Sequence, residues 1–108
     1  MERLDREIPR AEPVTFGGIR YETVRNARMR GFGQAGGVIA AIDEKSGAEL
    51  WALVVYHTPF DAAEERDTQD VFITQLRIAE DGKHLEVTNE RRQKFLVSPS
   101  DRSVTALP

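Results

Sequence analysis

The chain has 108 residues, no cysteine and a formal net charge of −3 at pH 7. This length predicts one domain that buries about two thirds of its unfolded surface, enough for a hydrophobic core without disulfides or metal. The lack of cysteine excludes thiol nucleophiles, disulfides, iron–sulfur clusters and thiolate zinc sites, and the small net charge is not typical of a nucleic-acid binder.

The N-terminal residues Met1–Glu7 contain no apolar core, so they do not match a secretory signal. The longest apolar run, Leu50–Tyr56, is far shorter than the roughly 20 residues that cross a membrane as a helix. We therefore expect a cytoplasmic protein without a membrane partner.

Residues 1–13 are charged, contain two prolines and show no periodicity. They predict a flexible N-terminal arm, followed by a single antiparallel β domain over residues 14–108. The first strand is expected near Phe16–Arg25, where Ile19, Tyr21 and Thr23 share one face.

Four glycines between residues 26 and 37 predict an irregular connection, with a short helix over Thr23–Arg30 as the alternative. Gly31–Gly36 matches the G-x-G-x-x-G pattern of dinucleotide sites. That pattern must open a helix, whereas the residues from Gly37 to Ile42 predict a strand. We therefore assign it no nucleotide role.

A first hairpin is predicted from Val38–Ile42, a polar turn at Asp43–Gly47, and Leu50–Tyr56. Leu50–Tyr56 is apolar on both faces, which predicts a central strand with both faces covered. A second sheet, the curl of a barrel, the N-terminal arm and another subunit are the alternatives for its cover.

The turn of this hairpin also carries a short motif, composed of Ala41, Ile42, Asp43, Ser46, Gly47 and Trp51. The motif resembles the blade repeat of quinoprotein-type β-propellers. A propeller needs several blades and a much longer chain, and the motif occurs once. The resemblance implies a hairpin and a packing role for Trp51, and it carries over no cofactor or catalytic residue.

The chain then becomes acidic, and Asp61 followed by Glu64 matches a helix N-cap, so a short helix over residues 62–67 is predicted beside the alternative of a solvated loop. Phe72–Ala79 alternates, with Phe72, Thr74, Leu76 and Ile78 on one face. The turn Glu80–Lys83 contains Asp-Gly and joins this strand to His84–Asn89.

A third hairpin is predicted from Lys94–Val97, a turn at Ser98–Ser103, and Val104–Leu107. Together the elements predict an all-β fold. It is a single antiparallel meander of about six or seven strands with at most one short helix. A curled sheet, a sandwich and a small barrel remain open as its architecture.

No catalytic residue, metal site or cofactor is predicted. His57 and His84 lie in different segments without partners at metal-ligand spacing, and the serines lie in turns, where hydroxyls bond local backbone.

Charge is distributed unevenly along the chain. Residues 16–36 hold one glutamate and four arginines, a net charge of +3, and residues 61–70 carry −4. The arginines, with Tyr21 and Phe32 as stacking surfaces, form a candidate anion or nucleic-acid site: Arg20, Arg25, Arg28 and Arg30. Mutual compensation of the two charged regions is the interpretation that we favour.

Three functions remain open. The first is a non-catalytic binding or protein-interaction module, such as a homodimer, with Trp51, Tyr56 and His57 as pocket or interface residues. The second is an anion- or nucleic-acid-binding domain that uses the arginines. The third is a small-molecule-binding or catalytic β-barrel with Glu86 or the same aromatic residues in its mouth.

Overall fold

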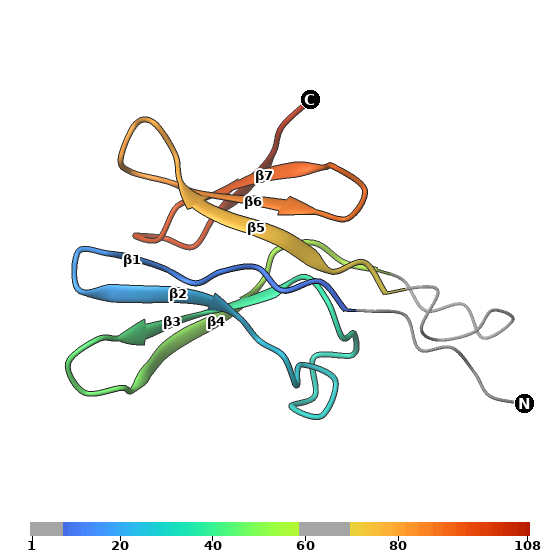
Figure 1. Cartoon of the computed structure of the whole chain (residues 1–108), viewed down its shortest axis with the longest axis horizontal. Coiled ribbons are helices and arrows are strands. Elements are labelled where there is room, and N and C mark those ends of the chain that lie inside the picture. Colours follow the sequence, from blue (N-terminus) through green and yellow to red (C-terminus); the bar gives the residue numbers. More distant parts are fainter. Residues whose placement is uncertain (1–7, 59–69) are drawn as a thin grey trace, which may run out of the picture.

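Eight β-strands and no helix make up the part of the chain that the structure describes, residues 8–58 and 70–108 of a computed structural model (Figure 1). All strand pairs are antiparallel, so the predicted all-β class is confirmed. The strands are β1 (Val14–Phe16), β2 (Ile19–Thr23), β3 (Val38–Asp43), β4 (Glu49–Val54), β5 (Ile73–Ile78), β6 (Leu85–Asn89), β7 (Lys94–Val97) and β8 (Val104–Ala106).

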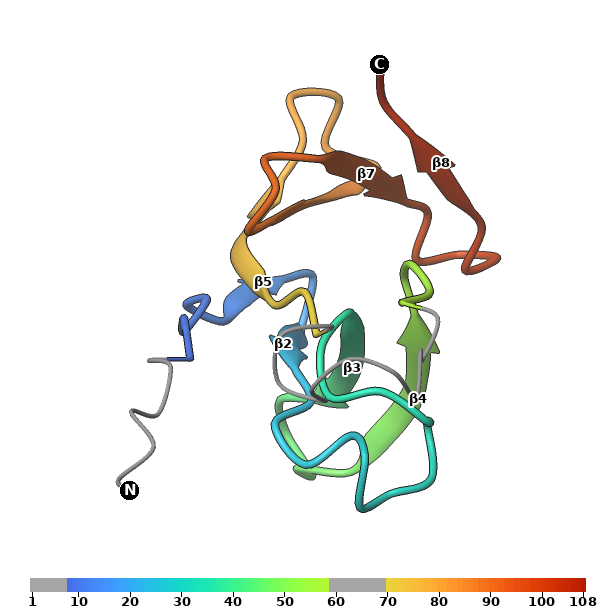
Figure 2. The ribbon, with the colours of Figure 1, turned by 90° about the vertical axis from the view of Figure 1, so that its right-hand side faces the viewer.

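The strands form two four-stranded sheets, each a meander in chain order. The first sheet has the order β1-β2-β3-β4 and the second β5-β6-β7-β8. Figure 2 shows the sheets as two layers that face each other. Among the described residues no strand pairing joins the two sheets, so they do not close into a barrel. Of the predicted architectures, the curled sheet or sandwich fits.

Strands β1 and β2 replace the single strand predicted over Phe16–Arg25. Phe16 pairs with Ile19, so a two-residue turn joins the strands. Gly17 and Gly18 occupy this turn with φ angles of 63° and 80°. A tight hairpin turn needs such positive values, and glycine adopts them without steric strain. The sequence prediction missed this turn, which is why it counted one strand too few.

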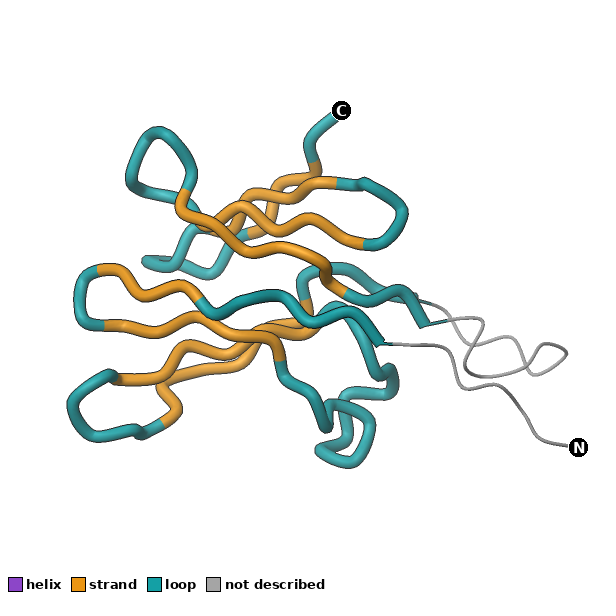
Figure 3. Tube along the Cα trace, viewed as in Figure 1, coloured by secondary structure: helices purple, strands orange, loops and turns teal. Residues whose placement is uncertain are grey.

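Residues 24–37 form the expected irregular connection. Its turns are closed by bonds such as the one from the Arg30 N–H to the Asn26 carbonyl at 3.0 Å, but they do not build the alternative helix over Thr23–Arg30 (Figure 3). Strand β3 begins directly after Gly37. The glycine motif is therefore not followed by the helix that a dinucleotide site requires.

Strand β3, and not Leu50–Tyr56, is the central strand of the first sheet. It lies between β2 and β4, whereas β4 is at the edge. Residues 38–42 of β3 are all buried, but the side chains of β4 are exposed or half-buried. The prediction for Leu50–Tyr56 was wrong because apolar side chains on both faces do not determine whether both edges are paired.

The two faces of β3 belong to separate hydrophobic clusters. Ile39 and Ala41 lie in the core between the sheets. On the other face, Val24 and Ala27 of the 24–37 connection pack against the side chains of Val38, Ala40 and Ile42. Figure 2 shows this connection on the side of the first sheet that faces away from the second. This connection, which the sequence analysis did not consider as a cover, protects the second face.

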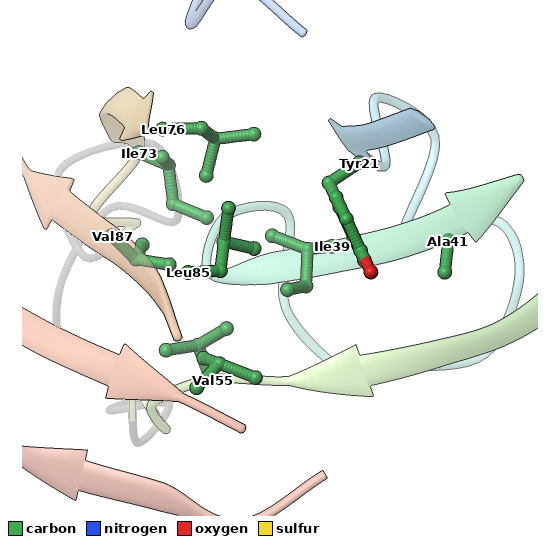
Figure 4. Packing of buried hydrophobic residues seen from close by; sticks show 9 residues of the cluster. Tyr21, Ile39, Ala41, Val55, Ile73, Leu76, Leu85 and Val87 are labelled. Carbon is green, nitrogen blue, oxygen red and sulfur yellow. The ribbon is translucent and has the colours of Figure 1, made fainter. Parts of the chain in front are cut away.

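The main core fills the layer between the sheets (Figure 4). Full burial of a valine- or leucine-sized side chain stabilises a fold by about 1.5–3 kcal/mol, so this layer holds the sheets together. Its buried members are Tyr21, Ile39, Ala41, Val55, Ile73, Leu76, Leu85, Val87 and Val97.

Strand β5 departs from the predicted alternation. The sequence placed Ile73 and Leu76 on opposite faces, yet both are buried in the main core. A bulge between Ile73 and Gln75 shifts the register against β6, which brings both side chains to the same face. The later hairpins lie where the sequence predicted them.

Some predictions lie outside the described residues, namely the short helix over 62–67 and most of the N-terminal arm. Of the arm, residues 8–13 are described, and Ala11 packs against the main core. Among the described residues there is no helix of the length and apolarity that crossing a membrane requires.

We predict that Gly36→Ala destabilises the fold by about 2–3 kcal/mol, because the added methyl group overpacks a closed contact. A Cβ at Gly36 would lie 2.3 Å from the carbonyl oxygen of Val71 and 2.8 Å from its carbonyl carbon. Urea unfolding measures the effect.

Gly47→Ala is the matched control. A Cβ there meets no atom within 4 Å, although φ is +76°. We expect a loss of about 1–2 kcal/mol from the left-handed backbone alone. Equal losses in the two variants would contradict the close contact at Gly36.

Candidate functional site

Three of the four candidate arginines form ion pairs within the molecule. Arg20 donates to Glu22 at 2.9 Å and contacts Glu44 at 3.4 Å. Arg30 forms a two-bond pair with Glu49 at 3.0 and 2.7 Å. The hydrogen bond from Arg30 lowers the pKa of the Glu49 carboxyl, and the same bond raises the pKa of Arg30.

The third pair joins the two oppositely charged regions of the sequence. One terminal nitrogen of Arg28 lies 2.9 Å from both carboxylate oxygens of Asp70. Asp70 is buried and also accepts the Ala35 N–H at 3.2 Å. Arg25, in contrast, is exposed and makes no ion pair with any described residue.

This pair belongs to a partly buried set of polar side chains, which we call the polar clamp; its members are Arg28, Gln34, Tyr56 and Asp70. The Gln34 amide donates to the carbonyls of Gly36 and Tyr56, both at 2.8 Å, and accepts the Thr58 N–H at 3.2 Å. Gln34 is only 4% exposed. These bonds satisfy backbone groups that would otherwise be buried without partners.

The predicted pocket or interface residues Trp51, Tyr56 and His57 are not brought together. The Tyr56 ring stacks on Phe95 at 5.2 Å, and its hydroxyl donates to the Val71 carbonyl at 2.6 Å. Burial raises the pKa of this hydroxyl far above its usual range. His57 is exposed. Tyr56 therefore acts as a structural residue of the polar clamp.

Trp51 lies on β4 and packs against the main core. Its ring centroid is 6.2 Å from that of Tyr21, and the Arg102 guanidinium lies 5.9 Å from it. Glu86, the other barrel-mouth residue considered, lies on the face of β6 opposite Leu85 and Val87 and pairs with Arg77. Neither Trp51 nor Glu86 lines either cleft described below.

Neither of the two aromatic rings that were proposed to stack on nucleic-acid bases has a free face for stacking. The Tyr21 ring is buried. Phe32 packs against the hydrophobic cluster on the face of β3 that points away from the second sheet, and the Arg30 guanidinium lies 5.5 Å from the centroid of its ring.

Described residues line two clefts of similar volume. The first, which we call the arm cleft, has a volume of about 490 Å³ and is lined by residues 8–11, 22–26 and 35–38, among others. Arg10 and Arg25 both line it, and neither forms an ion pair with a described residue.

The second cleft, which we call the open-end cleft, has a volume of about 480 Å³. It lies where the turns β1–β2, β5–β6 and β7–β8 gather at one end of the sandwich (Figure 1). Its lining residues are Phe16, Gly17, Ile19, Tyr21, Ile78, Gly82, Lys83, His84, Ser98, Pro99 and Ser100.

One histidine, His84, lies in this cleft with a carboxylate partner. Its Nδ1 is 2.6 Å from Asp81, whose pKa is lowered first by the Lys83 backbone N–H and then by His84. Ser98 and Ser100 line the same cleft but bond each other at 3.2 Å rather than His84. A serine nucleophile needs a base within hydrogen-bond reach, and this contact is not made. Within residues 8–58 and 70–108 no cluster of potential ligands fits a metal ion.

The sequence analysis did not identify Gln34 as a functional or structural residue. Gln34 is the one amide side chain between Gly31 and Gly37, and an uncharged polar residue there is a signal for backbone capping. Tyr21 was predicted only as a stacking surface, and its position in a cleft depends on turns that are far away in the sequence.

Comparison with protein-family models gave no match, and a search of curated proteins found no similar sequence. We therefore infer function from the geometry of this chain.

We predict that Asp70→Asn destabilises the fold by about 2 kcal/mol, since hydrogen bonds to buried charged groups contribute about 1.5–3 kcal/mol. Glu44→Gln is the control, because its pair with Arg20 is exposed and such pairs contribute at most about 1 kcal/mol. Urea unfolding of both variants tests this, and a larger loss for Glu44→Gln would contradict it.

Proposed function

We propose that the protein is a non-catalytic interaction module that forms a homodimer through the edge of β4. The observation that carries this proposal is the position of an apolar strand at the edge of a sheet. Residues 50–54 of β4 contain no charge and no proline, and Leu50 is 50% exposed.

The backbone of β4 presents N–H and C=O groups along this edge that no described strand pairs with. The Val55 N–H donates to the Gly37 carbonyl at 2.7 Å, and Val38 pairs with Val54. Because antiparallel pairs alternate, the N–H and C=O groups of Ala52 and Val54 point away from β3. A second copy that pairs in antiparallel fashion would place Ala52 opposite Val54, with the twofold axis at Leu53.

The remaining edges are less suited to pairing. Strands β1 and β8 have three residues each, and Pro13 precedes β1. Strand β5 packs beside β1 and β2. Natural edge strands are protected by shortness, proline, charge or bulges. In β4 a bulge at Leu50 interrupts the pairing with β3 but leaves Trp51–Val54 regular.

We predict that the protein is a dimer at tens of micromolar and that Ala52→Pro makes it monomeric, as measured by size-exclusion chromatography with light scattering. Proline at position 52 removes an N–H that points outward, so pairing with β3 is kept.

Ala106→Pro is the matched control. The Ser98 N–H bonds the Ser103 carbonyl at 2.9 Å, and the alternation in β8 likewise turns the N–H of Ala106 outward. This variant should stay dimeric, and circular dichroism should show both variants folded. A monomeric wild-type protein, or dissociation by Ala106→Pro alone, would reject the β4 interface.

A second candidate function is the binding of a small anion in the arm cleft. The observation that favours it is the presence of Arg10 and Arg25 in one cleft without carboxylate partners among the described residues. The other arginines considered are compensated by Glu22, Glu49 and Asp70.

We predict that pyrophosphate shifts the amide resonances of residues 25–26 and 36–37 in a saturable manner, and that Arg25→Gln weakens this binding several-fold. Arg20→Gln, which removes an arginine already paired with glutamates, should leave it unchanged. Binding should also weaken with salt. Equal effects of the two substitutions would exclude the arm cleft as the site.

A further inference from the structure

The open-end cleft combines an apolar wall with a polar rim. Phe16, Ile19 and Ile78 supply the wall, and Phe16 is 50% exposed although it is a large aromatic side chain. Lys83, Ser98 and Ser100 lie at the turns that form the rim. A volume of about 480 Å³ falls within the range of about 300–1,000 Å³ in which proteins bind small molecules.

Tyr21 supplies a polar group to the cleft. Its side chain is largely buried and lines the cleft, and its hydroxyl makes no hydrogen bond with any described residue. Because no described side-chain oxygen is both buried and without a partner, this hydroxyl is reached by solvent, and a ligand in the cleft can contact it. Burial raises the pKa of Tyr21, so the hydroxyl keeps its proton at neutral pH and can donate a hydrogen bond.

The surroundings of Tyr21 keep its ring in place. Trp51 packs against it with ring planes inclined at 47°, and Ile39 and Ala41 belong to the same cluster (Figure 4). The hydroxyl is therefore a positioned donor rather than a mobile one, which is what recognition of a single acceptor atom requires.

We propose that the open-end cleft binds a small apolar molecule that carries one hydrogen-bond acceptor, with the apolar body against Phe16, Ile19 and Ile78 and the acceptor at the Tyr21 hydroxyl. This site shares no residue with the β4 edge, so the test of the cleft and the test of the homodimer are independent of each other.

The test uses two probes of nearly equal shape, acetophenone and ethylbenzene, of which only the first has an acceptor. Titrations are followed through the amide resonances of the ¹⁵N-labelled full chain. We expect acetophenone to shift residues 16–21, 78–84 and 98–100 in a saturable manner and to bind several-fold more tightly than ethylbenzene.

Two variants identify the groups involved. Tyr21→Phe keeps the ring and should remove the preference for acetophenone, a change of roughly 2- to 10-fold for a hydrogen bond of about 0.5–1.5 kcal/mol. Ile78→Trp should fill the cleft and weaken both probes. The dispersion of the amide resonances reports whether each variant is folded.

The titrations with the two probes distinguish an error in the site from an error in the role of the hydroxyl. No saturable shift with either probe, or shifts centred outside the three turns, would overturn the site. Binding of both probes that Tyr21→Phe leaves unchanged would overturn the role of the hydroxyl. If Ile78→Trp does not fold, Ser100→Trp at the exposed rim replaces it, and undiminished binding by a folded filling variant counts against the cleft.

Discussion

The fold depends on the burial of β3 on both of its faces. Ile39 and Ala41 need the second sheet as cover, and Val38, Ala40 and Ile42 need the 24–37 connection. An irregular connection buries backbone groups that no ladder satisfies, so it can cover a sheet only if side chains take up those bonds. Gln34 and Asp70 do so, which makes buried polar groups a condition for the apolar packing around them.

The hairpins could be predicted because each is a local pattern. Turn residues such as Gly47 and Gly82 stand between apolar strands, and both have positive φ in the structure. Edge and centre could not be predicted in the same way. The short residues Ala40 and Ala41 give β3 a modest apolar signal beside Trp51 and Leu53 of β4, although β3 is the strand that both neighbours pair with. Strand order is a property of pairing, which composition does not encode.

The candidate sites were harder to predict from the sequence, because their residues come from distant parts of the chain. The excess of arginine was visible, but the partner of Arg28 is 42 residues away, and only the fold shows that Arg25 lacks such a partner among the described residues. The open-end cleft is built from three turns in different parts of the chain. A bulge also limits prediction within a single strand. One additional residue near Thr74 places Ile73 on the face opposite to the one that simple alternation predicts.

The polar clamp also governs how the two sheets are connected. Thr58 is bound by Gln34, and Asp70 is bound by Arg28 and Ala35, so both ends of the crossover between the sheets are fastened to one connection. The 24–37 connection therefore covers the outward face of β3 and also holds Asp70, from which the chain enters β5. A break in the polar clamp would loosen the cover of the first sheet and release the start of the second at the same time.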